Sequence, residues 1–204
     1  MKKIFITLLI FVSVSAFSQK IDDVFKTMPN SILPGLSEGN RTMFLVDTGK
    51  TVIPYPLGEI EKLAYSSDFL KIKTSEIGTT QIKLLPLIND TQIICVIKTV
   101  CGNACDSNIK FYSTDWKELD ADTLLPHISA ESFLDESKKD TDNYKFAVSL
   151  PDIYPISAEF ENDSNRLTLK LDFKKYLSNE QLAEIKPFIK SDTITLNWNN
   201  TSFR

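Results

Sequence analysis

The sequence has very little of what most catalytic and metal sites require. It contains one histidine, His127, in 204 residues. A serine nucleophile needs a base, usually histidine, and His127 follows a proline in an apolar stretch that favours a partly buried structural role. No His-Glu-x-x-His pair or glycine-rich phosphate loop is present. We therefore expect no catalytic residue, no metal site and no cofactor.

The chain also lacks an excess of positive charge. Lysine and arginine total 23 against 27 acidic residues, so the net charge is −4. Nucleic-acid binding requires a basic surface, and this composition does not favour it. With 42% hydrophobic and 25% charged residues, the chain is typical of a folded globular protein and not of a disordered one.

The apolar run at the N-terminus is too short to span a membrane. Lys2 and Lys3 precede an apolar stretch over residues 4–14. Small residues lie at positions −3 and −1 relative to a cleavage site after Ser18. This pattern predicts a cleaved signal peptide over residues 1–18 and a periplasmic or secreted protein with no stable membrane insertion. Removing it takes away two lysines, so the net charge of −4 becomes −6.

Cysteine is scarce, with three residues. Because thiols of exported proteins tend to form disulfides, the predicted export makes a disulfide among these three residues a reasonable expectation. Cys101 and Cys105 are a candidate disulfide across a short turn, with two free thiols as the alternative. A redox centre is disfavoured because three residues intervene where oxidoreductases usually have two. Cys95 lies in the apolar run 93–97, which is typical of a buried strand.

The periodicity of the first half predicts mainly antiparallel strands. Apolar residues at helical spacing predict a helix over 21–28 that Pro29 ends, and proline and glycine predict irregular structure over 30–58. A short helix is expected over 59–65. Four strands with short turns then follow as a meander, around residues 70–72, 82–84, 93–97 and 109–111.

The second half is also expected to form mainly strands, which begin after a polar, irregular stretch. Strands are expected at 144–148, 156–160 and 167–173, and an edge or penultimate strand at 194–198. Ser178 and Gln181 form a capping box that predicts a helix start, and Pro187 limits that helix. The order of elements predicts an α+β fold of antiparallel sheets with a few short helices. We expect one domain over 19–204, with two similar sheet-based halves, about 19–120 and 121–204, as the alternative.

One aromatic cluster is a candidate binding site. Tyr112 and Trp116 lie in the segment 111–116, where aromatic rings favour contact with a sugar or a peptide. The alternative is that they are strand-end residues that cover the core.

Several motifs resemble those of an exported family of Bacteroidetes proteins, a domain of unknown function. The motifs are Phe25-x-x-Met28-Pro29-x-Ser31-Ile32-Leu33-Pro34, Ile82-Lys83-Leu84-Leu85, Ile94-Cys95 and Asp106-Ser107-x-Ile109-x-Phe111-Tyr112-Ser113-x-Asp115-Trp116. The resemblance covers nearly the whole chain after residue 18. It implies envelope location, a sheet resembling that of β-lactamase-inhibitor protein and protein binding. It provides no catalytic residue and does not imply lactamase inhibition.

These observations favour a non-enzymatic binding or structural protein of the bacterial cell envelope that recognises a protein, peptide or glycan. The alternative is an envelope enzyme that uses dispersed carboxylates or the Cys101 and Cys105 thiol pair. Acidic residues are too numerous for a carboxylate pair to be identified from the sequence.

Overall fold

The computed structural model describes residues 19–204, except 47–50, 57 and 162–163. The signal peptide expected over residues 1–18 lies outside this part. Within it, no helix is both long enough and apolar enough to cross a membrane.

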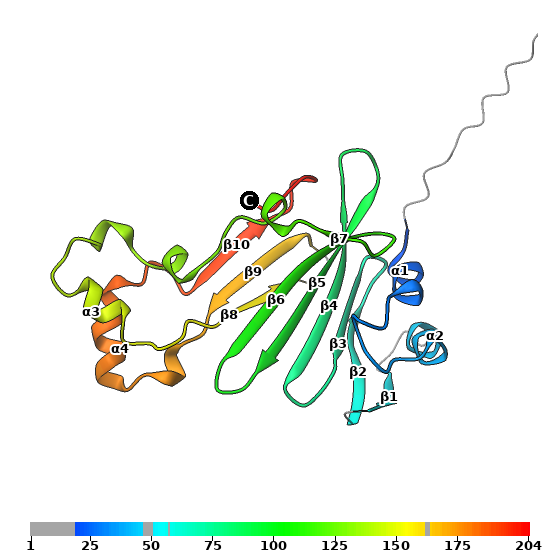
Figure 1. Ribbon diagram of the computed structural model, residues 1–204, viewed down its shortest axis with the longest axis horizontal. Coiled ribbons are helices and arrows are strands. Elements are labelled where there is room, and N and C mark those ends of the chain that lie inside the picture. Colours follow the sequence, from blue (N-terminus) through cyan, green and yellow to red (C-terminus); the bar gives the residue numbers. More distant parts are fainter. Residues whose placement is uncertain (1–18, 47–50, 57, 162–163) are drawn as a thin grey trace, which may run out of the picture.

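The first half of the chain forms a seven-stranded antiparallel sheet (Figure 1). Each strand pairs with the next in sequence, so the sheet is a meander. Cys95 lies in β5, an interior strand, as its apolar sequence predicts. The strands are β1 (Val52–Tyr55), β2 (Gly58–Tyr65), β3 (Phe69–Lys73), β4 (Gly78–Pro86), β5 (Gln92–Cys101), β6 (Cys105–Ser113) and β7 (Glu118–Leu119).

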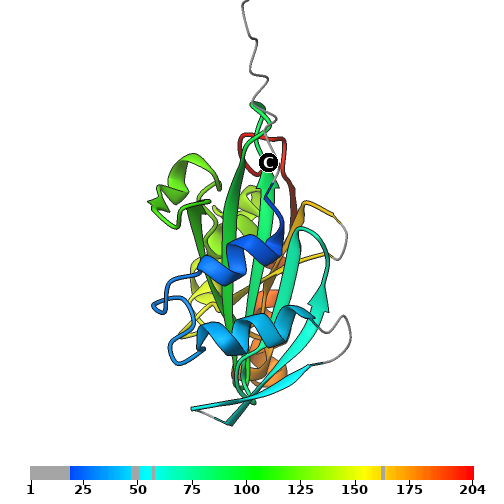
Figure 2. The same cartoon turned by 90° about the vertical axis from the view of Figure 1, so that its right-hand side faces the viewer.

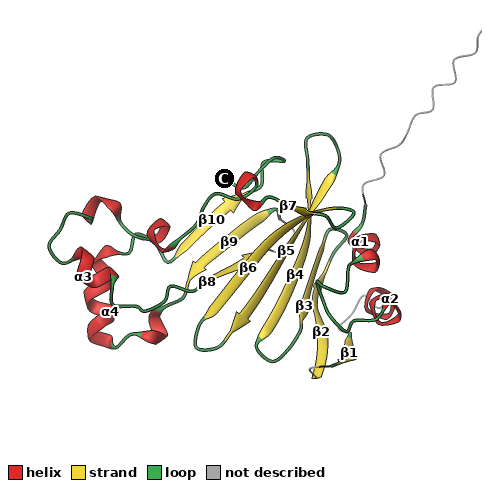
Figure 3. Cartoon of the chain, in the orientation of Figure 1, coloured by secondary structure: helices red, strands yellow, loops and turns green. Residues whose placement is uncertain are grey.

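A three-stranded antiparallel sheet follows, in the order β10-β9-β8, with two short helices at the end of the molecule far from the N-terminal helices (Figure 3). The last strand is at the edge, as predicted. The α+β class is confirmed. These elements are α3 (Tyr144–Val148), β8 (Ile156–Phe160), β9 (Arg166–Leu171), α4 (Asn179–Ile185) and β10 (Thr193–Asn197). Short 3₁₀ turns lie at Ala121–Thr123, Ala130–Phe133, Glu136–Lys138, Lys174–Tyr176 and Lys186–Phe188.

The seven-stranded sheet is buried on both faces along β5. Ile94 and Val96 belong to a core shared with helices α1 (Ile21–Thr27) and α2 (Glu38–Val46). Cys95 belongs to a second core shared with the three-stranded sheet. Figure 2 shows α1 and α2 lying across one face of the sheet. Neighbouring residues of a strand point to opposite faces, so the part of β5 that is covered on both sides, residues 93–97, is apolar throughout.

The irregular structure expected over 30–58 is wrong, because α2 and β1 lie in this segment. Ser37 precedes α2 and accepts the Asn40 N–H at 3.2 Å, an N-cap contact. The buried Arg41 donates to the carbonyls of Leu36, Lys26 and Met28. Arg41 therefore links α2 to the end of α1 through buried hydrogen bonds. The sequence did not indicate this role, because a charged residue is normally expected at the surface.

The helix expected over 59–65 is also wrong, because these residues form β2. Ile60 and Lys62 point inward while Leu63 is 45% exposed. Lys62 donates to the Phe44 carbonyl at 2.7 Å, so a lysine occupies an inward position of the strand. The period of two was hidden because this inward residue is charged and an outward one is apolar.

The strand expected over 144–148 is the helix α3. Tyr144 and Ala147 are buried, three residues apart, while Phe146 is 59% exposed. The alternation of aromatic and apolar residues suggested a strand, but packing of Tyr144 on Phe188 buries the i and i+3 positions instead.

Side chains join the two sheets where a backbone ladder is missing. Three outward N–H groups of β8 donate to these side chains. The Ile156 N–H donates to Asp106 at 3.0 Å, the Ala158 N–H to Ser107 at 2.8 Å and the Phe160 N–H to Gln81 at 3.0 Å. Gln81 also donates to the Ala158 carbonyl at 3.2 Å. Polar side chains of β4 and β6 thus satisfy the edge of β8, which would otherwise be open to pairing.

Candidate functional site

The candidate site is a groove on the helix-covered face of the seven-stranded sheet, where the helices no longer cover it. It has a volume of about 350 Å³ and lies between the segment after α1 and strands β5 to β7. Volumes of this size are at the small end of ligand sites. The residues that line it are Pro29, Ser31, Ile32, Val96, Lys98, Asn108, Lys110, Tyr112, Trp116 and Glu118.

Trp116 is placed in the groove by the β6–β7 turn. Its backbone has φ 64°, the left-handed region that is rare for a bulky residue. The turn is closed by Ser113, which accepts the Trp116 N–H and donates its own N–H to Lys117, both at 2.9 Å. The indole donates to the Val24 carbonyl of α1 at 3.2 Å. An aromatic residue is thus kept where glycine or asparagine would be less strained.

Tyr112 lies beside Trp116, with the ring centroids 5.5 Å apart at 53°. The structure therefore brings the two predicted residues together. Tyr112 is only 7% exposed and belongs to the core, and burial raises its pKa. It forms the inner wall of the groove more than an open platform. A binding role for the pair stays a prediction.

Two lysines that the sequence analysis did not single out also line the groove. Lys110 pairs with Glu118 at 2.8 Å, which raises the lysine pKa. Lys98 is half-buried, and burial, together with the nearby Lys110, lowers its pKa. The charge of Lys110 is thus balanced within the groove. In the part of the chain that is described, no carboxylate forms an ion pair with Lys98.

In the sequence, the feature that could have pointed to these lysines is that each lies two residues from a core residue on the same face of its strand. Ile94, Val96 and Lys98 share a face of β5, and Tyr112 and Lys110 share the same face of β6. In each strand the face changes from apolar to cationic where the helical cover ends. Sequence alone does not reveal this, because it does not say how far the helices extend.

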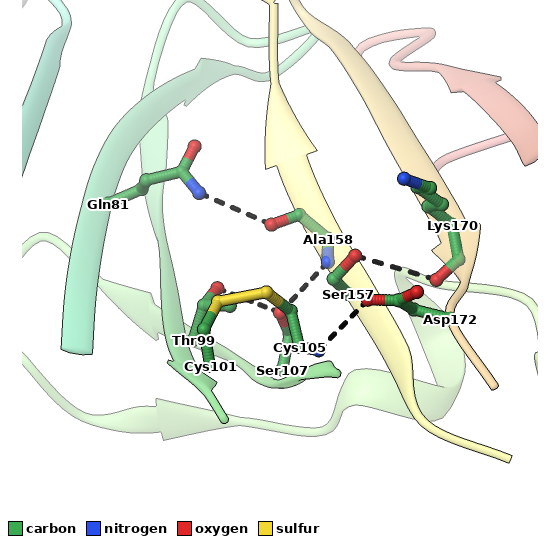
Figure 4. Close-up of a disulfide and its surroundings, with 9 residues drawn as sticks. All are labelled: Gln81, Thr99, Cys101, Cys105, Ser107, Ser157, Ala158, Lys170 and Asp172. Carbon is green, nitrogen blue, oxygen red and sulfur yellow. Dashed lines mark hydrogen bonds between the residues drawn. A yellow bond between two sulfur atoms is a disulfide. The ribbon is translucent and has the colours of Figure 1, made fainter. Parts of the chain in front are cut away.

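Cys101 and Cys105 are joined as a disulfide at the β5–β6 turn (Figure 4). Cys95 is free and buried. The Cys105 N–H donates to Asp172 at 3.2 Å. Ser107, two residues on, accepts the Ala158 N–H. The disulfide therefore belongs to the junction between the two sheets and is not among the residues that line the groove.

His127 lies outside the groove, in a separate cavity of about 340 Å³ between β6, β8 and the segment 121–128. It is exposed, so the expected partial burial is wrong. A loop position beside Pro126 leaves it at the rim, near Asp106, Asp122 and Tyr154. Within the described ranges, no three His, Cys, Asp or Glu side chains are grouped to hold a metal ion.

Gly35, Ser37 and Gly39 have the Gly-x-Ser-x-Gly spacing of a hydrolase nucleophile elbow. That elbow joins a strand to a helix, whereas Ser37 follows a turn and caps α2. His127, the one histidine of the sequence, lines a cavity with residues of the other core and does not accompany this serine. The segment is a helix start.

Comparison with known proteins gives a family and a fold. A family model described as a protein of unknown function, DUF3256, matches residues 13–203. No curated protein matches. A solved structure of a domain of an uncharacterized protein from Porphyromonas gingivalis W83 is similar over 92% of this chain and 99% of that chain, with 22% identity and a TM-score of 0.81.

The solved structure shares the fold of this chain, and its source agrees with the Bacteroidetes resemblance in the sequence motifs. The match to the family model extends over nearly all of the sequence and includes every residue that lines the groove. The expectation of a domain of unknown function is confirmed. The chain belongs to the DUF3256 family of proteins of unknown function.

Proposed function

We propose that this protein is an exported, non-enzymatic binding protein of the bacterial cell envelope, and that it recognises a protein, peptide or glycan in the groove lined by Tyr112 and Trp116. The observation that carries the proposal is the open end of the helix-covered face, where Trp116 is kept in a left-handed conformation and a half-buried lysine, Lys98, lines the same groove. Backbone strain of this kind concentrates at functional sites.

Three further features support binding over catalysis. The groove combines one apolar wall with a few polar groups, which is the usual composition of a ligand site. The candidate thiols are bonded to each other and lie at the sheet junction. Export, inferred from residues 1–18, places the groove in the envelope, where proteins, peptides and glycans are available as ligands.

The test is to fill the groove. Asn108 is an exposed residue of β6 that lines it, and aromatic residues are well tolerated on strands. We expect the mature chain to bind members of an array of envelope peptides and glycan fragments, and Asn108→Trp to reduce that binding at least tenfold. Thr195→Trp is the matched control, because Thr195 is exposed on β10 and does not line the groove.

Thermal unfolding of both variants shows whether either substitution disturbs the fold. Equal binding by wild-type protein and a folded Asn108→Trp variant would exclude the groove as the site. Absence of any binding, together with turnover of an envelope substrate, would replace the proposal with the enzyme alternative.

A further inference from the structure

Lys98 is a groove residue that forms no ion pair with any of the described residues. Its partners across the ladder are Thr80 on β4 and Asn108 on β6, so both cross-strand neighbours are neutral. The charged group that acts on it is another cation, Lys110, and burial also lowers its pKa. A half-buried ammonium in this situation has lost part of its hydration and gained no counter-ion from the described residues.

The two lysines that are fully buried in the described part of the chain do have partners. Lys62 donates to the Phe44 carbonyl at 2.7 Å, and Lys83 forms an ion pair with Asp68 at 2.7 Å. Lys110, in the same groove as Lys98, is paired with Glu118. Where this protein places a lysine in its interior, it supplies an acceptor, and Lys98 departs from that rule at the surface of a groove.

We propose, building on the proposed function, that the groove binds an acidic segment of a peptide or protein, and that Lys98 contacts its carboxylate. The Asn108 amide and the Ser31 hydroxyl, which also line the groove, supply donors for the remaining oxygen lone pairs. Trp116 and Ile32 provide an apolar wall for the neighbouring part of the ligand.

A peptide fits the groove better than a sugar chain does. A sugar ring stacks on an open aromatic face, but Tyr112 is 7% exposed and its ring is tilted by 53° to that of Trp116. A volume of about 350 Å³ accommodates one or two side chains. The groove thus has room for an aspartate or glutamate side chain, and donors among its lining residues suit a carboxylate.

The experiment uses two pools of seven-residue peptides with blocked ends that differ only in a central aspartate or asparagine. The mature wild-type chain should retain the aspartate pool at least tenfold better, as quantified by mass spectrometry of the bound fraction. Lys98→Gln should lose this preference, and Lys98→Arg should keep it because the positive charge remains. Lys170→Gln, at an exposed lysine of β9, is the matched control and should behave as wild type.

The outcomes separate this inference from the proposed function. If both pools bind equally, and Asn108→Trp abolishes both, the groove binds peptides but the carboxylate assignment is wrong. If oligogalacturonate binds through Lys98 and the aspartate pool does not, the ligand is an acidic glycan and the peptide assignment is wrong. If no peptide and no glycan binds, both proposals fail.

Discussion

The two ends of one sheet face differ in how completely they are covered. Over β1 to β4, helices α1 and α2 close the face, and the lysine there, Lys62, lies under Phe44 with a carbonyl as partner. The cover ends along β5 beyond Val96, and the lysine there, Lys98, lines an open groove. The strands, the meander and the face are the same, so the difference comes from the helical layer alone.

A charged residue at an inward strand position can therefore play either of two roles. At the closed end it fastens the cover to the sheet and contributes to stability. At the open end, Lys98 has no ion-pair partner among the described residues, and we propose that a ligand supplies one. Substitutions at the two ends should therefore change different measured quantities, stability at the closed end and binding at the open end.

The largest effect is expected at Arg41, which fastens α2 to α1. Arg41→Met leaves the carbonyls of Leu36, Lys26 and Met28 without their donor. Each buried acceptor left unpaired costs about 1–3 kcal/mol, so we expect a loss of about 3 kcal/mol or more in the free energy of unfolding. Urea denaturation measures it.

Arg166→Met is the control for Arg41, because Arg166 forms an exposed ion pair with Glu161 at 3.1 Å. We expect a change below about 1 kcal/mol there. Equal effects of the two substitutions would show that Arg41 does not tie the helical cover to the protein.

An intermediate effect is expected from one substitution made at both ends of the face. Lys62→Met removes the donor to the buried Phe44 carbonyl and should cost about 1–3 kcal/mol. Lys98→Met removes a charge that has no ion-pair partner among the described residues, and should change stability by no more than about 0.5 kcal/mol. Thermal and urea unfolding of both variants measure the two changes, and a larger loss of stability at Lys98 than at Lys62 would show that the two ends of the face do not differ in this way.

The smallest effect is expected in how the free energy of unfolding depends on pH, through a contact at the helix-covered end of the face. Tyr65 donates to Asp22 of α1 at 2.5 Å, and this hydrogen bond, with burial, raises the pKa of Tyr65 to about 12. Because the folded-state pKa is above the unfolded value near 10, the stabilisation is present below about pH 10 and is lost as the pH rises through about 12.

Tyr65→Phe should cost about 1 kcal/mol at pH 8 and make stability fall less steeply between pH 10 and pH 12. Urea unfolding at several pH values, with hydrogen exchange of the α1 amides, measures both effects. Superimposable pH profiles for the variant and the wild type would show that the contact with Asp22 does not link α1 to the pH dependence.

Much of the fold was predictable wherever local pattern and tertiary environment agree. The strands β3 to β6, β8 and β9 form where alternating or continuously apolar residues predict them. Ser178 with Gln181 caps α4 as predicted, at 2.9 and 3.2 Å. The errors fall where a polar side chain is buried or an apolar one exposed, as at Arg41, Lys62 and Phe146. In those places the packing of other elements outweighs the local pattern.

The candidate site was predictable only in part. Tyr112 and Trp116 are neighbours in sequence, so their aromatic character pointed to one place, and the structure puts their rings in contact. Lys98 and Ser31 come from distant segments, and only the meeting of the β5–β6 hairpin with the turn after α1 puts them in one groove. A sequence gives no measure of that distance.

By itself, the sequence determined the α+β class, the order of the meander and the resemblance to a family, because these depend on residue type and on period along the chain. The tertiary structure decided which polar residues are enclosed and where the helical cover ends, because both depend on contacts between distant segments. Lys62 and Lys98 are the same residue type on the same face of one sheet. Only the coverage by α1 and α2 makes one a tie of the fold and the other a candidate ligand contact.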